Sequence, residues 1–222
     1  MTNSNDTSGL YKAPFFIAIA GNIGVGKTTL TKKISEHFEF KAFYERVINN
    51  PYLDDFYNNM ERWSFNLQVF FLSQRFIDQK AIFSSSVPCV QDRSIYEDAE
   101  IFAYILYKQG FMSPRDYESY RQLFYNMTDY LRKPDLILYL KASTWTLISR
   151  IRKRGRDYEQ KITKDYLFQL NEAYERWINS IKNDFNVLTI DADNFDLEKN
   201  PHMIFDVYSK IQHKIDLYNQ IN

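Results

Sequence analysis

The chain has little of several residue types that mark specialised classes of protein. One cysteine, Cys89, stands among its 222 residues, so a disulfide cannot form within one chain. Cys89 lies in an apolar stretch, where a small buried hydrophobic residue is a better interpretation than a catalytic thiol. The lack of a disulfide framework favours a reducing compartment, and we expect a cytoplasmic protein.

An excess of charge of one sign and long hydrophobic runs are also missing. The 28 Lys and Arg residues balance the 28 Asp and Glu residues. Proteins that follow a nucleic acid need a basic surface against its phosphates, so a nucleic acid polymer is not an expected partner. The apolar run at residues 13–20 is too short to span a bilayer, which argues against a membrane partner. We expect residues 1–13 to be flexible.

No linker rich in proline, glycine or serine divides the chain, so we expect one domain over residues 1–222. Short apolar runs typical of buried strands occur at 15–20, 40–44, 87–91, 135–140 and 185–190. Apolar residues at helical spacing occur between and after them, at 27–38, 63–83, 97–108, 114–131, 145–153, 164–182 and 202–218. This alternation predicts an α/β fold, a five-stranded parallel sheet flanked by helices, which binds ligands at the carboxyl ends of its strands.

The segment after the first predicted strand matches the phosphate-binding P-loop pattern G-x-x-x-x-G-K-[ST] in full. Its residues are Gly21, Asn22, Ile23, Gly24, Val25, Gly26, Lys27 and Thr28. Glycines let backbone N–H groups converge on phosphate oxygens, and the N-terminus of the following helix adds partial positive charge. We expect Lys27 to reach the β- and γ-phosphates of ATP, Thr28 to bind Mg²⁺, and Thr29 to complete the ATP site. The pattern leaves the phosphate acceptor open.

Charged residues follow the second and third predicted strands, namely Glu45 and the pair Asp92-Arg93. A carboxylate beside an attacking hydroxyl can accept its proton, whereas one beside an attacking phosphate repels it, so Glu45 predicts an alcohol acceptor. We expect Arg93 to hold Glu45 and to stabilise charge on the transferred group, and Asp92 to orient Mg²⁺. Surface ion pairs at strand ends are the alternative interpretation.

A basic run at residues 150–156 contains Arg150, Arg154 and Arg156. Arg150 and Arg154 are four residues apart and share one face of the predicted helix. Kinase lids place guanidinium groups on the charge that develops in the transition state and exclude water, so the run predicts a lid over ATP. A solvated basic helix end is the alternative, and the P-loop favours the lid.

Together, these motifs resemble those of the deoxynucleoside kinase family, which includes deoxycytidine, deoxyguanosine and bacterial deoxyadenosine kinases. The family has a glutamate base after its second strand, a Glu/Asp-Arg-Ser motif and an arginine lid, which match Glu45, Asp92-Arg93-Ser94 and the run at 150–156. The resemblance implies that ATP with Mg²⁺ phosphorylates the 5′-hydroxyl of a deoxynucleoside in nucleoside salvage. It implies that the catalytic residues are Glu45, Arg93 and Lys27.

The resemblance also implies a nucleoside pocket. Family members read the base with residues that Gln68, Arg75 and Asp98 match, and stack it on an aromatic residue that Phe102 matches. The implied substrate-binding residues are Glu45, Tyr57, Gln68, Phe71, Arg75, Arg93, Asp98, Phe102 and Glu159. Tyr57 and Glu159 match the pair that binds the sugar 3′-hydroxyl. The Arg75 and Asp98 pair resembles the purine and cytosine branches, which implies that thymidine is a poor acceptor. The resemblance favours deoxyadenosine, with deoxyguanosine or deoxycytidine as possible acceptors.

A few further positions concern the binding of the donor base and the substrate preference. Asp191, Ala192 and Asp193 match a family loop under the base of the donor, and the resemblance implies a homodimer. Arg46 stands where the family often has proline, and Asn50 lacks the bulky aromatic residue found nearby in several members. These two departures leave the fine substrate preference open.

Two other functions remain as alternatives to a deoxynucleoside kinase. A nucleoside monophosphate kinase resembling thymidylate kinase would share the P-loop, an Asp-Arg strand end and a basic lid, but Glu45, Tyr57 and Glu159 argue against it. A non-catalytic, nucleotide-dependent switch module would need only the P-loop. The absence of an Asn-Lys-x-Asp motif for base binding weakens this second alternative.

Overall fold

A five-stranded parallel sheet forms the centre of the fold. The computed structural model describes residues 13–45, 50–195, 197 and 200–221. Its strands are β1 (Phe16–Gly21), β2 (Lys41–Phe43), β3 (Cys89–Asp92), β4 (Leu136–Lys141) and β5 (Val187–Asp191). Their order across the sheet is β2-β3-β1-β4-β5, and every neighbouring pair is parallel. The predicted α/β fold is therefore confirmed, while the flexible segment expected at residues 1–13 lies almost entirely outside the described residues.

The sequence of β1 explains its central place. All six of its residues are buried, and none carries a charge. A strand covered on both faces by helices needs apolar side chains pointing in both directions, so it shows a continuous apolar run instead of alternation. Ile17 lies between Val90 of β3 and Leu136 of β4 in the register of the sheet. The edge strands β2 and β5 are more exposed.

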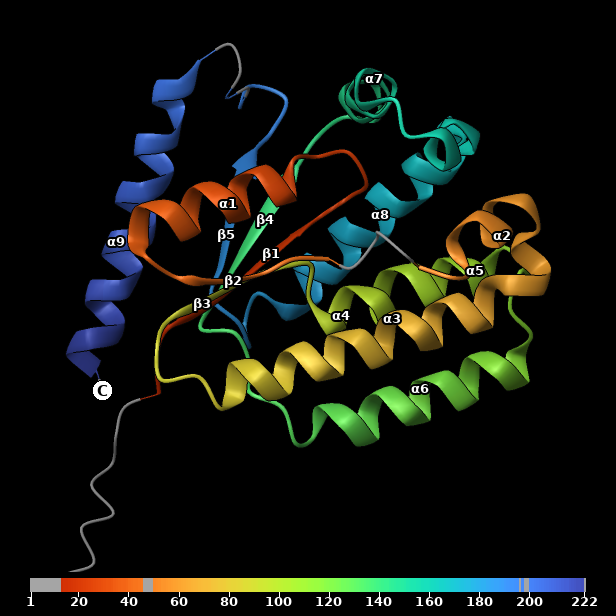
Figure 1. Cartoon of the computed structure of the whole chain (residues 1–222), viewed down its shortest axis with the longest axis horizontal. Coiled ribbons are helices and arrows are strands. Elements are labelled where there is room, and N and C mark those ends of the chain that lie inside the picture. The colour runs from red at the N-terminus through yellow and green to blue at the C-terminus, as the bar shows by residue number, and fades with distance from the viewer. Residues whose placement is uncertain (1–12, 46–49, 196, 198–199, 222) are drawn as a thin grey trace, which may run out of the picture.

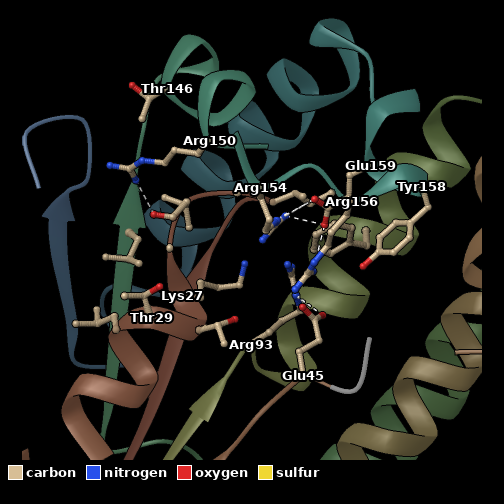
Figure 2. Close-up of a pocket in the computed structure, with 18 of the residues that line it drawn as sticks. Lys27, Thr29, Glu45, Arg93, Thr146, Arg150, Arg154, Arg156, Tyr158 and Glu159 are labelled. Carbon is tan, nitrogen blue, oxygen red and sulfur yellow. Dashed lines mark hydrogen bonds and ion pairs between the residues drawn. The ribbon is translucent and has the colours of Figure 1, made fainter. Parts of the chain in front are cut away.

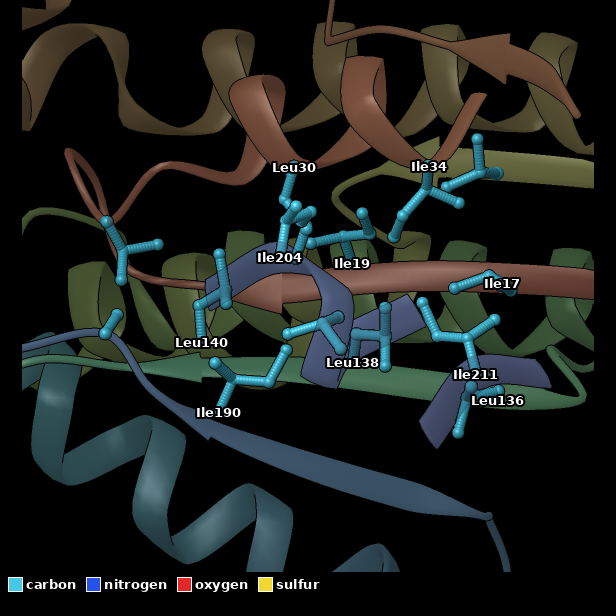
Figure 3. Close-up of a cluster of buried hydrophobic side chains, with 14 of the residues drawn as sticks. Ile17, Ile19, Leu30, Ile34, Leu136, Leu138, Leu140, Ile190, Ile204 and Ile211 are labelled. Atoms are coloured by element: carbon cyan, nitrogen blue, oxygen red, sulfur yellow. The ribbon is translucent and has the colours of Figure 1, made fainter. Parts of the chain in front are cut away.

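One face of the sheet is covered by α1 (Lys27–Phe38), α7 (Thr144–Arg154) and α9 (Ile204–Ile221). Figure 3 shows Leu30 and Ile34 of α1 above the strands, and Ile211 of α9 beside Leu136. These side chains belong to one buried cluster with Ile17 and Ile19. Burying apolar surface of this kind contributes roughly 25 cal/mol per Å² removed from water. This layer fixes the P-loop, because the loop connects β1 directly to α1 (Figure 1).

The other face is covered by α3 (Met60–Phe83), α8 (Lys164–Ile181) and a π-helix at Asp98–Ala103. The short helices α4 (Ile95–Glu97) and α5 (Tyr104–Lys108) flank the π-helix, and α2 (Leu53–Asn58) packs on α3. The outermost helix on this side is α6 (Pro114–Thr128), which packs along α3 (Figure 1). Within the described ranges, no helix is long and apolar enough to cross a membrane.

Several boundaries differ from the predicted ones. The predicted strand at 87–91 begins only at Cys89, because Pro88 has no N–H for the ladder, although its carbonyl accepts a hydrogen bond from Lys41. The helix predicted at 97–108 is instead α4, the π-helix and α5, and it begins earlier because a capping box joins Ser94 and Glu97. The helix predicted at 202–218 starts as a 3₁₀ turn, Pro201–Met203. We did not predict α2 or the 3₁₀ helix Asp157–Lys161.

Candidate active site

A cavity of about 1160 Å³ lies at the carboxyl ends of the strands, where a parallel sheet of this kind binds its ligands. Figure 2 shows how α1, α7 and the segments after β2 and β3 surround it. The wall includes most residues predicted for the site, namely Ile23, Gly24, Val25, Gly26, Lys27, Thr28, Thr29, Glu45, Tyr57, Gln68, Phe71, Arg93, Asp98, Phe102, Arg150, Arg154, Arg156, Glu159 and Asp193. The predicted residues that do not line the cavity are Gly21, Asn22, Arg75, Asp92, Asp191 and Ala192.

The P-loop forms one end of this cavity. Lys27 is buried, and its ammonium group donates to the carbonyl oxygens of Gly21 at 2.8 Å and Asn22 at 3.1 Å. Burial and the nearby positive charge of Arg93 lower the pKa of Lys27 to about 8. Gly24 has a φ of +82°, and a Cβ there would lie 2.7 Å from Cγ1 of Ile151 on α7. A glycine is therefore required at this position by both backbone conformation and packing.

Asn22 anchors the loop to α8 instead of facing the cavity. Its Nδ2 donates to the carbonyl of Leu167 at 2.9 Å and to Oδ1 of Asn171 at 2.7 Å, while its Oδ1 accepts from the backbone N–H of Ile23. Asn171 in turn donates to the carbonyl of Ala142, which follows β4. These bonds hold the second residue of the loop and thus fix the direction of the N–H groups after it.

Thr28 and Asp92 meet beside the P-loop. The hydroxyl of Thr28 donates to Oδ2 of Asp92 at 2.5 Å. Asp92 is fully buried, and its Oδ1 has no hydrogen-bond partner among the described residues. Burial raises the pKa of Asp92 above its usual value, although Lys27 opposes this effect. A hydroxyl and a buried carboxylate with a free oxygen fit a hydrated Mg²⁺, which prefers few protein ligands and completes its shell with water and phosphate oxygens.

Glu45 lies among three cations. Its Oε1 accepts a hydrogen bond from Nη2 of Arg75 at 2.8 Å, and Nε of Arg93 lies 2.8 Å from the same oxygen without its N–H pointing along a hydrogen-bond direction. Burial alone would raise the pKa of Glu45, but Arg93, Arg75 and Lys27 together lower it to about 2. The carboxylate is therefore ionised throughout the physiological range. Figure 2 shows Glu45 beneath Arg93 and close to Lys27.

The opposite end of the cavity carries polar groups suited to a planar base. Gln68 is buried, and its Oε1 has no partner among the residues that the structure describes. Asp98 is also buried, and its Oδ2 accepts from Nε of Arg75 at 3.3 Å. Burial raises the pKa of Asp98 to about 6 despite the opposing charge of Arg75. Phe102 contributes a ring that lies under the guanidinium of Arg93, 4.3 Å from its carbon.

Arg75 lies behind this end, not on its wall. Its guanidinium contacts Glu45 and Asp98 and donates to the backbone carbonyl of Asp92 at 3.3 Å, and only 2% of the residue is exposed. In this structure Arg75 therefore acts on the cavity through the two carboxylates that it binds. Tyr57 stands on the wall and stacks against Tyr158, with ring centroids 6.1 Å apart.

The predicted lid arginines do not act as one group. Arg150 connects α7 to the P-loop and to the segment after β5, because it donates to the carbonyls of Val25 and Ala192, each at 2.8 Å. Arg154 and Arg156 instead bind Glu159, at 2.6 Å and 3.3 Å (Figure 2). Glu159 is 4% exposed, whereas the two arginine side chains are more than a third exposed.

The donor-base loop predicted at Asp191, Ala192 and Asp193 begins at the last residue of β5. Asp193 accepts from the backbone N–H of Ser143 at 3.0 Å, and Asp191 accepts from the N–H of Asp193 and from Asn194. Asp193 is the one residue of the three on the cavity wall. The loop thereby joins β5 to the start of α7.

Two buried residues beside the site, Glu97 and Tyr174, were not predicted from the sequence. Glu97 accepts from the backbone N–H of Gly21, and Tyr174 accepts from Nη1 of Arg93. The capping-box spacing of Ser94 and Glu97 was a signal for the first residue. No sequence signal distinguishes Tyr174, because it follows the apolar spacing of α8.

The fold and the loop between β1 and α1 show that this protein has a P-loop kinase fold. Residues 17–216 match the deoxynucleoside kinase family. The chain is 41% identical over 197 residues to the deoxyadenosine/deoxycytidine kinase of Bacillus subtilis (strain 168), covering 88% of this chain and 90% of that protein. It is 40% identical over 188 residues to the deoxyguanosine kinase of the same organism, covering 83% and 90%. The chain therefore belongs to the deoxynucleoside kinase family.

Solved structures show the same relationship. The chain resembles a deoxyadenosine kinase from M. mycoides with the products dCMP and dCDP bound, with a TM-score of 0.79 and 31% identity. The match covers 88% of this chain and all of that one. The same M. mycoides enzyme with bound dATP gives a TM-score of 0.78 at 31% identity. The predictions of the family, the fold class and an ATP-dependent deoxynucleoside kinase are thereby confirmed.

Proposed function

We propose that the protein transfers the γ-phosphate of ATP to the 5′-hydroxyl of deoxyadenosine, with deoxyguanosine or deoxycytidine as further acceptors. The observation that carries this proposal is that one cavity is lined both by the P-loop and by Glu45, Gln68 and Asp98. One cavity can thus hold the phosphates of ATP beside a nucleoside, with a carboxylate near the hydroxyl and polar groups near the base. The deoxyadenosine/deoxycytidine kinase of Bacillus subtilis and the dATP-bound enzyme of M. mycoides support the choice of acceptor.

In the proposed reaction, Glu45 accepts the proton of the 5′-hydroxyl as that oxygen bonds to the γ-phosphorus and the bond to the β-phosphate oxygen breaks. Because the pKa of Glu45 is about 2, the base is weak and its first role is to orient the hydroxyl. Proton transfer then follows late, which suits the loose transition state of phosphoryl transfer. Arg93 holds Glu45 and places positive charge beside the transferred group.

The P-loop end holds the donor in this proposal. Lys27 turns from the carbonyls of Gly21 and Asn22 to the phosphates, and Thr28 and Asp92 hold Mg²⁺. The ion supplies charge neutralisation on the phosphate oxygens when it is bound. Arg154 and Arg156 reach the same phosphates from the lid, and the loop at residues 191–193 lies under the donor base.

The acceptor end recognises the nucleoside by paired donors and acceptors. Gln68 offers an amide whose Oε1 is free, and Asp98 offers a carboxylate that accepts from an exocyclic amino group. Phe71 and Phe102 supply apolar walls, while Tyr57 and Glu159 face the sugar. Thymidine has no exocyclic amino group, so its base offers Asp98 no donor, and we expect it to be a poor acceptor.

A steady-state assay tests this function. ATP with Mg²⁺ is supplied with each of the four deoxynucleosides and, in parallel, with their monophosphates. We expect turnover of deoxyadenosine above deoxyguanosine and deoxycytidine, with little turnover of thymidine. Turnover of monophosphates alone would favour the kinase resembling thymidylate kinase, and nucleotide binding without transfer would favour a switch module. Membership of the deoxynucleoside kinase family disfavours both of these alternatives.

Three broader features belong to the same proposal. We infer a single domain over residues 1–222, a homodimer and a cytoplasmic location, all from the sequence and the resemblance. Size-exclusion chromatography with light scattering tests the homodimer, and a mass near 26.6 kDa would contradict it.

A further inference from the structure

A buried group of four residues joins the P-loop to the catalytic arginine. Tyr174 of α8 is fully buried, and its hydroxyl lies 2.8 Å from the carbonyl oxygen of Gly21, 2.8 Å from Oε1 of Glu97 and 3.0 Å from Nη1 of Arg93. Glu97 is also fully buried, and its Oε1 accepts from the backbone N–H of Gly21 at 3.1 Å. Its other oxygen accepts from the N–H and the hydroxyl of Ser94, at 2.7 Å and 3.1 Å.

The chemistry of these groups fixes the direction of each hydrogen bond. The guanidinium of Arg93 can only donate, so the hydroxyl oxygen of Tyr174 accepts from it. The single proton of the hydroxyl then goes either to Glu97 or to the carbonyl of Gly21. Burial and the charge of Glu97 raise the pKa of Tyr174 well above its usual value, which keeps this proton in place.

Apart from the bond to Tyr174, the contacts of the Arg93 side chain among the described residues are not directed hydrogen bonds, and they include an ion pair of Nη1 with Oε1 of Glu97 at 3.8 Å. Its backbone has a φ of 70°, an uncommon conformation for a residue with a side chain. Its Nε contacts Glu45 without a well-directed hydrogen bond, and its guanidinium lies over the ring of Phe102. Tyr174 therefore supplies a directed hydrogen bond on the side of Arg93 away from Glu45.

We propose that Tyr174, with Glu97, is a positioning residue that holds Arg93 at a fixed place relative to the P-loop. The inference rests on the proposed phosphoryl transfer, because Arg93 is the group that orients Glu45 and stabilises the transferred phosphate. The carbonyl of Gly21 contacts both Tyr174 and Lys27. When Lys27 turns to the donor phosphates, this carbonyl becomes free to take the proton of Tyr174. The hydroxyl thus links the two halves of the site.

The test is Tyr174→Phe, which removes the hydroxyl and keeps the ring. The matched control is Tyr139→Phe, because Tyr139 is buried beside Tyr174, with ring centroids 5.8 Å apart, and donates to Glu175 instead of contacting Arg93. We expect Tyr174→Phe to lower kcat about tenfold, the effect of one hydrogen bond, with KM for the deoxynucleoside changed less than threefold. Tyr139→Phe should leave kcat within twofold of wild type, and both variants should melt within a few degrees of each other.

A double-mutant cycle separates positioning from general stability. In an Arg93→Lys background, Tyr174→Phe should change kcat less than twofold, because the group through which it acts is gone. If Tyr174→Phe lowers kcat tenfold in the Arg93→Lys background as well, the two effects are independent and the inference is overturned. A Tyr174→Phe enzyme with the kcat of an active wild type would also overturn the inference, but not the proposed function.

A wild-type protein that phosphorylates no deoxynucleoside would overturn the proposed function and, with it, this inference.

Discussion

Arg154 donates hydrogen bonds to both carboxylate oxygens of Glu159, from Nε to Oε2 at 2.9 Å and from Nη2 to Oε1 and Oε2 at 2.6 Å each. A residue proposed to bind the sugar is thus paired with an arginine proposed to bind the phosphates. Glu159 is buried and Arg154 is partly exposed, so the carboxylate is the fixed partner and the arginine the movable one. We therefore expect sugar binding at Glu159 to be coupled to the delivery of Arg154 to the phosphates.

Replacement of Glu159 tests this connection. Glu159→Gln should raise KM for a deoxynucleoside about tenfold or more, because the amide is a weaker acceptor for a sugar hydroxyl. It should also narrow the preference for 2′-deoxynucleosides over 2′,3′-dideoxynucleosides, which lack the hydroxyl that the carboxylate binds. Steady-state kinetics with both acceptors measure the effect.

A control for the charge change lies in the same 3₁₀ helix. Asp157 is exposed, so Asp157→Asn removes one negative charge from the lid without altering the pair formed by Glu159. An equal loss of acceptor preference in Asp157→Asn and Glu159→Gln would contradict the assigned role of Glu159.

Some parts of the fold and of the candidate site were predictable from the sequence, and others were not. The P-loop was predictable because its conformation depends on glycines and a lysine that are contiguous in the chain. The observed helix α1 begins at Lys27 and ends at Phe38, as predicted, because its apolar residues recur at helical spacing. The pairing of Glu45 with Arg93 was also predictable, because both follow strands that end at the same edge of the sheet.

Contacts between distant segments escaped sequence reasoning. Arg150 and Arg154 share a helical face, yet one binds the carbonyl of Val25 and the other binds Glu159, and spacing alone does not distinguish these partners. Tyr174 follows the apolar pattern of α8, and only the tertiary structure brings its hydroxyl to Arg93. Side-chain chemistry that depends on packing between layers is therefore the part that sequence patterns could not supply.

Glu45→Gln tests the proposed base. The amide cannot accept a proton and does not balance the charges of Arg93 and Arg75, so we expect kcat to fall by about 10²–10³. Steady-state kinetics with saturating ATP and the preferred deoxynucleoside give the value. Glu36→Gln is the charge-matched control, because Glu36 is an exposed residue of α1 that pairs with Lys32 on the same helix. Turnover of Glu45→Gln within twofold of wild type would show that the base is misassigned.

The pKa values of two buried groups predict the pH dependence of kcat/KM, which reports on the free enzyme. Asp98, with a pKa of about 6, is a stronger acceptor for an amino group when ionised, so kcat/KM for deoxyadenosine should rise as the pH increases through about 6. Lys27, with a pKa of about 8, attracts phosphate only when protonated, so kcat/KM should fall as the pH increases through about 8.

Asp98→Asn provides the comparison for this profile. The variant should lose the rise near pH 6 and retain the fall near pH 8, because Lys27 is unchanged. Titration of ATP itself is common to both enzymes and cancels when their profiles are divided. If the rise persists in Asp98→Asn with the same midpoint, a group other than Asp98 causes it.

Gly24→Ala tests the packing of the P-loop against α7. The added Cβ would lie 2.7 Å from Cγ1 of Ile151 and 3.1 Å from the carbonyl oxygen of Leu147, at a backbone φ of +82°. Gly110→Ala is a matched control, because Gly110 has a φ of +80° but no atom beyond its chain neighbours lies within 4 Å of the added carbon. The control should lower the free energy of unfolding by about 1 kcal/mol from backbone strain alone, and Gly24→Ala by about 2–4 kcal/mol, since overpacking adds to that strain. Chemical denaturation measures both values. If both variants lower the free energy of unfolding equally, α7 moves away from the added Cβ at no cost. The backbone conformation of the loop, and not its contact with α7, would then determine its shape.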